Sequence, residues 1–490
     1  MGARSGLTPI LRRVRVNDET VYRHWLNFCR PEASLLLTRL TLFFGCALAL
    51  LAQSDAPDDA SATGSDATYS GPAILSRGET PNQQFATPLA FRPFGGVSAI
   101  YDAGLLPISL NSGGVVPSTD MYGVEANLGA YTYRIWKHTT LSLDFRGDYR
   151  HYTMSYWDAS NSFLSLALTH HASKHTTFNL RAEGGLYSDN YFLSEGLGLA
   201  GPQYLQLPQN DLYYNRVIFA SVAGDLTYQL TRRLSLNFGG QGTLVRRESS
   251  ALYGMAGAIA HGDLQYRVTR HTTIGADYRF TRFDYTKGFG GANIHSVGLN
   301  YSTMFTRHFQ LSARIGGADV QSTSLTEVAL DPAVAALVGV TQGIQAAYRS
   351  NYIPDIEVRM EDKMRRNDFS ASYLNQVTPG NGVYLTSRNN TGAVAYSYTG
   401  LRHLNFGING SYGTMTTLLQ NFGAYRTWGG GLGITRDLGK GLHWVVRLDA
   451  HHYDIANAAS DVLAPFYRHN EYRTSVGFTY SPGDIPLVLW

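Results

Sequence analysis

Charged side chains recur at every second position in several segments of this 490-residue chain. The clearest case is residues 141–151, where aspartates and arginines alternate with large apolar residues. In an extended strand, neighbouring side chains point to opposite faces, so all these charges share one face. Such a face can do two kinds of chemistry: it can set the field acting on a dissolved solute, or it can neutralise its own charges in ion pairs. Both uses remain open.

Charges of this kind occur along most of the chain. We predict that they line the lumen of a closed sheet, and the candidates are Glu125, Asp144, Arg146, Asp148, Arg150, Arg181, Glu183, Asp225, Asp263, Arg267, Asp277, Arg279, Arg314, Asp355, Glu357, Arg359, Arg447, Asp449 and Arg473. Acidic and basic members are nearly balanced in number, so no strong preference for anions or cations is expected. A uniformly basic lining, which would suit an exporter of acidic polymers, is absent from this set.

Motifs for enzymatic chemistry are missing from the sequence. There is no GxSxG, P-loop or HExxH motif. A hydrolase would have to recruit Ser475, His451 and Asp449, which nothing distinguishes from their neighbours. His451 and His452 are adjacent on a strand and point to opposite faces, so they cannot chelate a metal together. We therefore expect no catalytic residues, no metal site and no cofactor.

The strands that carry these residues fill the chain from residue 92 to its end. Segments 141–151, 178–186, 274–280 and 444–452 all alternate apolar with polar residues. Large apolar residues occupy one face of nearly every strand, and charges of both signs occupy the middle of the other. A soluble sandwich buries its apolar faces, whereas a membrane barrel turns them toward lipid and encloses the polar faces. The pattern favours the membrane barrel.

Short basic turns repeat along this region. Adjacent turns lie roughly 37 residues apart, except for two intervals of roughly 58, which is typical of a repeated unit of two strands, a loop and a tight turn. Histidines in these turns are expected to anchor the barrel at the lipid headgroups. The turns are centred on Lys137, Lys174, Arg232, Arg270, Arg307, Arg365, Arg402 and Lys440.

The turns also predict the number of strands. Eight tight turns join sixteen strands, and one further strand before them (94–103) and one after them (470–480) make eighteen. We predict an all-β, antiparallel, transmembrane up-and-down β-barrel of about 18 strands (16–18), with both termini on the periplasmic side. A barrel of that width leaves an aqueous channel unless loops or side chains fill it.

The two longer intervals place extra residues in loops 187–212 and 319–350. In the second loop, Asp331 at an N-cap, Pro332 at the first helical position and Gly339 at the far end predict a short apolar helix that includes Leu337. One hypothesis is that this segment folds inward and narrows the channel. The alternative is an outer lid or a contact with a neighbouring protein.

The N-terminal segment indicates export. An apolar run at residues 40–52 follows Arg30 and Arg39, is too short to span a bilayer, and predicts a signal peptide over 1–52 with an extended n-region. Residues 53–91 are small and polar and predict a flexible periplasmic leader, followed by the barrel over 92–490. The only cysteines, Cys29 and Cys46, precede the expected cleavage site, so no disulfide or thiolate metal site is expected in the exported chain.

On these features the chain resembles the outer-membrane porin and barrel superfamily. It has about eighteen alternating strands, an aromatic last strand (Tyr472, Phe478, Tyr480) and a terminal Trp490. Residues 377–388 (VTPGNGVYLTSR) and the ending SPGDIPLVLW resemble a group of uncharacterised bacterial envelope barrels. The sequence departs from the pattern at Ser481, where the last strand is broken before the terminal aromatic. The resemblance covers most of residues 92–490 and implies an architecture, with no chemistry attached.

These observations predict an integral outer-membrane protein. The leading function is a channel, similar to a porin, for small polar solutes, and the alternative is a non-enzymatic structural or export-partner barrel with an occluded lumen, for example in surface-polysaccharide export. The expected partners are the lipid bilayer of the outer membrane and the barrel-assembly machinery. Other envelope proteins or a polysaccharide are further candidates. Once residues 1–52 are removed, the charges are nearly balanced, so no nucleic-acid partner is expected.

Overall fold

A computed structural model describes residues 91–105, 119–188, 216–249, 252–286, 288–329, 339, 341–364, 366–418, 423–456 and 469–481. The predicted signal peptide (1–52) and leader (53–91) lie outside this part of the chain, except for Phe91, which begins the first strand. In the described part, no helix is long and apolar enough to cross a membrane.

Antiparallel strands make up nearly all of the described residues, together with one short 3-10 helix, η2 (Ser155–Trp157). The strands are β1 (Phe91–Leu105), β2 (Thr119–Ile135), β3 (Thr139–Tyr152), β4 (Ala159–His171), β5 (Thr176–Tyr187), β6 (Val217–Gln229), β7 (Leu234–Arg247), β8 (Met255–Arg267), β9 (Thr272–Tyr285), β10 (Gly291–Met304), β11 (Phe309–Ala329), β12 (Gln342–Lys363), β13 (Asn367–Gly380), β14 (Leu385–Leu401), β15 (Leu404–Thr417), β16 (Ala424–Gly439), β17 (Leu442–Ala456) and β18 (His469–Tyr480).

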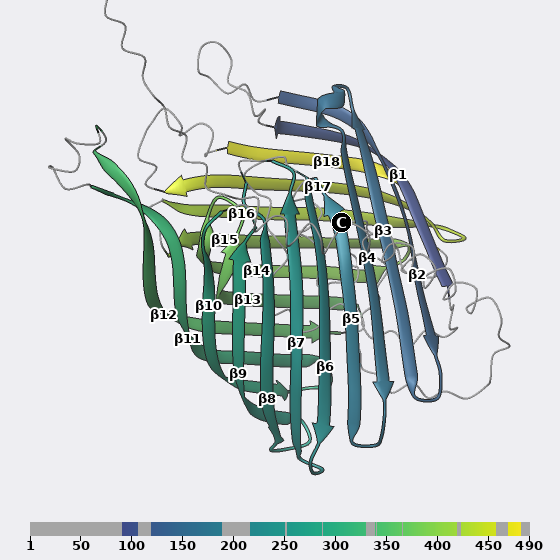
Figure 1. The fold of residues 1–490 in the computed structure, drawn as a ribbon. Coiled ribbons are helices and arrows are strands. Elements are labelled where there is room, and N and C mark those ends of the chain that lie inside the picture. Colours follow the sequence, from purple (N-terminus) through teal and green to yellow (C-terminus); the bar gives the residue numbers. More distant parts are fainter. Residues whose placement is uncertain are drawn as a thin grey trace, which may run out of the picture. The chain divides into compact units, whose positions relative to one another are not determined.

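The sheet closes on itself (Figure 1). Each strand pairs with its neighbours in the chain, and β1 pairs with both β2 and β18. The closing ladder runs from Gly95 opposite Tyr480 to Ala103 opposite Tyr472. The prediction of an all-β, antiparallel up-and-down barrel is confirmed, at the upper end of its range, with eighteen strands among the described residues.

Hydroxyl side chains build the repeated tight turns. Thr269 Oγ1 accepts the backbone N–H groups of His271 at 3.1 Å and Thr272 at 3.0 Å. Thr306 does the same for His308 at 3.2 Å and Phe309 at 2.9 Å. Each hydroxyl thus satisfies donors that a turn between two strands leaves without a ladder partner. Because this chemistry is local, it repeats wherever a Thr or Ser begins the turn.

The outer face of the barrel carries large apolar side chains. Leu128, Leu299 and Ile315 are 61 %, 68 % and 62 % exposed, and similar residues occupy alternate positions on most strands. An apolar area of this extent would drive aggregation in water. Against hydrocarbon it is solvated, while the ladder that closes from β18 to β1 pairs the backbone groups around the wall.

One expectation about the outer ends of the strands is wrong. Most of the predicted loop 319–350 is strand, because β11 continues to Ala329 and β12 begins at Gln342. The two strands pair along their whole length and form a hairpin arm that extends past the end of β10, whose pairing with β11 stops at Gly291 opposite Thr323. The proposed constriction residues Asp331, Pro332 and Leu337 lie outside the described residues.

The wall divides between β12 and β13. Their ladder runs from Lys363 opposite Asp368 only as far as Ile356 opposite Asn375. Among the described residues, β12 continues beyond this point with β11 alone, and β13 continues with β14 alone. Pro354 and Pro379 lie just past the division, and a proline cannot donate a ladder hydrogen bond, so it is confined to strand edges. The sequence therefore weakens the ladder where the two strands separate.

Candidate functional site

An ion pair joins the first and last strands inside the barrel. Arg473 donates from Nε to Asp102 Oδ1 at 2.6 Å and from Nη2 to Asp102 Oδ2 at 2.8 Å. Tyr152 donates its hydroxyl proton to Asp102 at 2.5 Å and accepts from Arg473 at 3.0 Å. Asp102 and Arg473 are directly opposite in the closing ladder, and all three side chains are buried. Their charges are therefore stabilised by each other and by the tyrosine.

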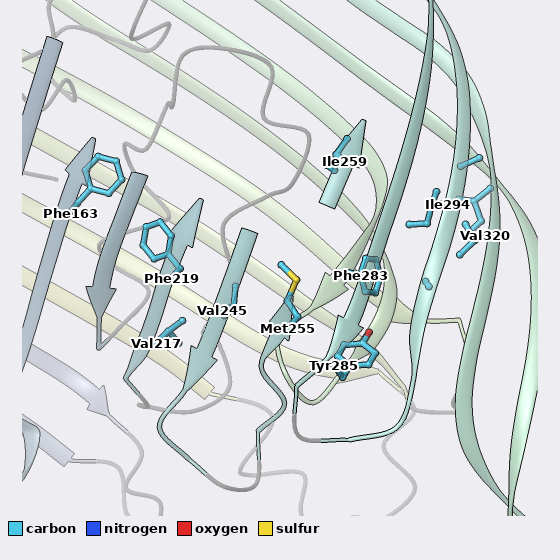
Figure 2. Packing of buried hydrophobic residues seen from close by; sticks show 13 residues of the cluster. Phe163, Val217, Phe219, Val245, Met255, Ile259, Phe283, Tyr285, Ile294 and Val320 are labelled. Carbon is cyan, nitrogen blue, oxygen red and sulfur yellow. The ribbon is translucent and has the colours of Figure 1, made fainter. Parts of the chain in front are cut away.

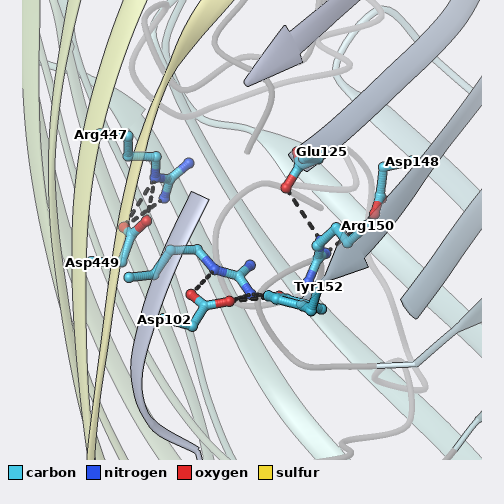
Figure 3. A network of polar contacts seen from close by, with 8 residues as sticks. Asp102, Glu125, Asp148, Arg150, Tyr152, Arg447 and Asp449 are labelled. Atoms are coloured by element: carbon cyan, nitrogen blue, oxygen red, sulfur yellow. Dashed lines mark hydrogen bonds and ion pairs between the residues drawn. The ribbon is translucent and has the colours of Figure 1, made fainter. Parts of the chain in front are cut away.

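Two further arginines are held in the same part of the interior (Figure 3). Arg150 forms ion pairs with Glu125 at 3.2 Å and with Asp148 at 3.2 Å. Arg447 binds Asp449 in a fork, with Nε at 2.7 Å from Oδ2 and Nη2 at 3.0 Å from Oδ1. All of these side chains are buried. This wall, from β17 through β1 to β3, is a dense network of paired charges.

A third centre lies on β9 to β12. Arg314 donates to Asp277 from Nε at 2.9 Å and from Nη2 at 2.7 Å, and its Nη1 lies 2.5 Å from Asp355 Oδ2. Ser296 accepts from Arg314 Nη2 at 2.8 Å and donates to Asp355 at 2.5 Å. One arginine therefore joins carboxylates from two strands, and removal of the arginine would leave both carboxylates buried without their cation.

The remaining predicted residues differ in burial, and Asp144 and Arg146 are as buried as the residues described above. Those paired with a residue two positions away are Arg146 with Asp144, Arg181 with Glu183, and Arg359 with Glu357. Asp225 and Asp263 lie 3.0 Å and 3.7 Å from His261 Nε2. Arg279 is half-buried, and Arg267 is exposed near the turn after β8. The Arg359 and Glu357 side chains are 40 % and 31 % exposed, so water reaches the interior along β12.

Sequence reasoning missed several members of these networks. Asp102 was overlooked because its strand was only roughly placed, and its partner Arg473 is 371 positions away. Ser296, Tyr152 and His261 were overlooked because they carry no fixed charge. Strand alternation would have found Asp102, Tyr152 and His261, since each shares its face with the charges of its own strand. Ser296 lies on β10, which has no Asp, Glu, Lys or Arg, so only the pairing of β10 with its neighbours brings it to the network.

The outer ends of β13 and β14 do not follow the wall. From Leu374 to Gly392 no residue is exposed, although residues on successive positions point to opposite faces. Thr386 and Ser387 are neighbours, and both are 0 % exposed. A strand in the wall would expose every second side chain to lipid or water. Both faces of this hairpin are therefore covered, and it lies inside the barrel. Residues 376–388 are called the inward hairpin below.

One side of the inward hairpin is held by β7 to β9. Thr386, whose φ is +39°, donates its backbone N–H to the Tyr285 hydroxyl at 2.5 Å, and the Tyr285 oxygen lies 2.9 Å from Thr386 Oγ1. The carbonyl of Gly382 accepts the backbone N–H of Tyr253 at 3.1 Å. Gly382 has φ +96°, and a Cβ there would lie 2.7 Å from Arg247 Nε, so glycine is required both by the turn and by the close approach.

The other side of the hairpin contacts β15 to β17. The Tyr384 hydroxyl donates to the carbonyl of Gly423 at 3.0 Å. Its ring packs in a buried cluster with Met415, Tyr425 and Tyr453. Within the turn, Asn381 Oδ1 accepts the backbone N–H of Tyr384 at 3.0 Å. The hairpin therefore bridges two walls that are separated by several strands on either side.

An apolar seat receives the hairpin (Figure 2). Inward side chains of β4 and β6 to β12 form a buried cluster that includes Phe219, Phe283 and Val320. Val377 and Leu385, one on each strand of the hairpin, pack against it. The interior is thus charged on some walls and apolar where the hairpin rests, and burial of the two hairpin side chains stabilises the inward position.

Comparisons with known proteins add only a general likeness. No protein-family model matches the sequence, and no curated protein matches it. The structure is similar to OpdL of Pseudomonas aeruginosa (12 % identity, TM-score 0.38, covering 80 % of this chain and 99 % of that chain). It is similar to OccAB4 of Acinetobacter baumannii, with 12 % identity and a TM-score of 0.39, and to the outer membrane protein OpdK of Pseudomonas aeruginosa, with 10 % identity and a TM-score of 0.40. Each of these matches covers 80 % of this chain and 98 % of the other chain.

The closed ladder and the apolar outer face decide the class of protein, because only a closed barrel can turn such strands toward lipid. The chain is an integral outer-membrane β-barrel. In this outer-membrane barrel, Ser475 pairs with Arg447, four residues from His451, which is about 13 Å along the strand. Asp449 is bound to Arg447. The nominated hydrolase residues are therefore not brought together. Among the described residues, no cluster of His, Cys, Asp and Glu is arranged to hold a metal ion.

Proposed function

We propose that the barrel is a channel for small polar solutes across the outer membrane. The observation that carries this proposal is the polar, charge-lined inner face, enclosed by a sheet of eighteen strands among the described residues. A barrel of this size is wide enough for an aqueous lumen. The solute path lies along the side of Arg359 and Glu357, where the side chains keep contact with water.

The inward hairpin, residues 376–388, is the constriction of this channel. It reaches walls on two sides of the interior and is covered on both of its faces. The dense networks around Arg473, Arg150 and Arg447 stiffen the wall from β17 through β1 to β3 and take no direct part in the solute path. Because the charges are mostly paired, the field along the path is weak and selectivity for the sign of an ion is low.

Single-channel recording of the purified barrel in planar lipid bilayers tests the proposal. We expect stepwise conductance, and in a salt gradient a reversal potential close to zero, because paired charges favour neither ion. Insertion into the outer membrane by the barrel-assembly machinery is part of the same proposal. A barrel that is folded, as judged by its heat-shifted electrophoretic mobility, but silent would contradict a channel. That result would favour a structural or export-partner role with an occluded lumen.

A further inference from the structure

Among the strands that the structure describes, none covers one edge of β12 beyond the division of the wall. In the described part of the chain, no strand pairs with residues 342–355 on the side away from β11. The consequence is visible in exposure: Tyr348 and Tyr352 are 76 % and 84 % exposed, the two highest values among the large apolar side chains. A side chain in a complete wall is flanked by strands on both sides. Here one flank is open, and a row of backbone donors and acceptors faces outward.

The outer half of β13 fits this open edge in register. Continuing the existing ladder by single steps from Ile356 opposite Asn375 would place Gln376 opposite Asp355. The same steps would place Thr378 opposite Ile353 and bring residue 383 opposite residue 348. No shift or bulge is needed as far as Gly380, where β13 ends. Residues 381–383 form the turn in the structure, with positive φ at Gly380 and Gly382, and would become extended to pair with β12.

The alternation of the hairpin also fits the wall. Gln376 and Thr378 would join the inward row that contains Asp355, so their polar side chains would face the lumen. Val377 and Val383 would join the outward row, next to the exposed tyrosines of β12. The alternation of these four residues therefore suits the wall as well as the bore.

The inward position carries costs that the wall position lacks. Thr386 has a backbone φ of +39°, a region that side chains other than glycine rarely adopt. Thr378 Oγ1 and Asn381 Nδ2 are buried and make no hydrogen bond. The wall position has a cost of its own, since Pro354 and Pro379 remove donors from the extended ladder. Opposing costs of this kind are typical of an element with two accessible positions.

We propose that residues 376–386 exchange between the bore and the wall. In the bore position they form the constriction described above. In the wall position residues 376–383 pair with residues 348–355 of β12, which completes the wall and opens the channel. This proposal rests on the channel function proposed above, and the Tyr285 contact to Thr386 is the latch that favours the bore position.

Cysteine pairs that can join only in the wall position test the exchange. The pairs are Ile353→Cys with Thr378→Cys and Ser350→Cys with Asn381→Cys. Hydrogen-bonded and non-hydrogen-bonded pairs alternate along an antiparallel ladder, and these two pairs are three positions apart, so one of them occupies a non-hydrogen-bonded site suited to a disulfide. The background replaces Cys29 and Cys46 with serine. A matched control, Glu361→Cys with Ser370→Cys, joins residues that are already opposite each other at a non-hydrogen-bonded site of the ladder. The full chain is exported, oxidised in the outer membrane and then purified for recording.

We expect at least one test pair to cross-link in the folded barrel, with a conductance several-fold higher than that of the reduced protein and restored to the original value by dithiothreitol. If the control cross-links while both test pairs stay reduced, the exchange is wrong even though the channel function stands. A cross-link that leaves a conducting barrel unchanged also overturns it. If the pairs cross-link but every variant is silent, the exchange stands and the channel function fails.

The latch gives an independent test. Tyr285→Phe keeps the ring in its seat but removes the hydroxyl that binds Thr386 and reaches the carbonyl of Pro379 at 3.3 Å. We expect the test pair that cross-links to do so roughly tenfold faster in the Tyr285→Phe background. The reason is that the loss of one or two buried hydrogen bonds raises the population of the wall position by about that factor. Tyr278→Phe, on the outward face of the same strand, is the control and leaves the rate unchanged. Equal rates in both backgrounds would remove the latch from the account.

Discussion

The β11–β12 and β13–β14 hairpins are consecutive in the chain and end on the same side of the barrel, yet they occupy opposite environments. The first stands out from the wall, with Tyr352 84 % exposed. The second folds into the interior, where Thr386 is completely buried. Both alternate polar and apolar residues, so alternation does not decide where a hairpin goes. The difference lies in the prolines at the division, the glycine turn at Gly380 and Gly382, and the apolar seat that receives Leu385.

The largest expected effect is on stability, at the base of the β11–β12 hairpin. Arg314→Met leaves Asp277 and Asp355 buried without their cation, which should lower the free energy of unfolding by about 3–5 kcal/mol. Urea unfolding in lipid vesicles, followed by tryptophan fluorescence, measures the loss. Arg359→Met is the control, because its pair with Glu357 is partly exposed and contributes about 0–1 kcal/mol. Equal losses in the two variants would show that burial does not distinguish these pairs.

Truncation of one leucine in each hairpin compares the two environments directly. Leu385→Ala removes a side chain packed on the apolar seat and should destabilise the folded barrel by about 2 kcal/mol. Leu325→Ala, at a position that is 47 % exposed on the arm, should change stability by less than about 0.5 kcal/mol. The same urea titration measures both. A larger loss at Leu325 than at Leu385 would reverse the assignment of the two environments.

Restoring a backbone donor at the division should shift the inward hairpin toward the wall. Pro354→Val gives β12 the N–H that the proline lacks, which is worth about 1 kcal/mol, or roughly a fivefold change in the ratio of the two positions. The time that single channels spend in the high-conductance state measures this ratio. Pro93→Val, in β1, opposite Ala130 of β2 and away from the division, is the control. No change, or more time in the low-conductance state, would speak against the role given to Pro354.

The smallest effect is expected on the arm itself. Tyr352→Ser removes an exposed ring that has open space on one flank, so stability should change by no more than about 0.5 kcal/mol. Conductance should stay at the wild-type value in the same preparation. A loss of more than 2 kcal/mol in the free energy of unfolding would mean that the ring is covered in the folded barrel. The claim that this edge of β12 is open would then be wrong.

Most of the fold could be predicted because its determinants are local. Alternation along 141–151 predicted the strand and its polar face, and the repeated short basic segments predicted the turns. In the structure, hydroxyl residues such as Thr269 and Thr306 close these turns by bonding to residues two and three positions later. The number of strands followed from the spacing of these turns. The length of β11 and β12 could not be predicted, because nothing at residues 324–329 marks the point where the neighbouring strand stops.

The interior could be predicted only in part. The charged residues were found from strand alternation, but their partners were not, because Asp102 and Arg473 meet only through closure of the barrel. The inward hairpin was not predicted at all. Its residues alternate as wall residues do, and its position depends on Tyr285, Phe283 and other side chains far away in sequence. The proposed constriction at Asp331 remains a hypothesis, since it lies outside the described residues.

The most direct test of the central claim is to shorten each hairpin in turn and record single-channel conductance. In one variant, residues 379–386 are replaced by Asn-Gly, which joins the paired residues Thr378 and Ser387 in a two-residue turn. In the other, residues 324–327 and 344–347 are removed together, which preserves the register of the arm. The account predicts a conductance several-fold above wild type for the first variant and an unchanged conductance for the second. Wild-type conductance in both folded variants would contradict the claim that the inward hairpin constricts the channel.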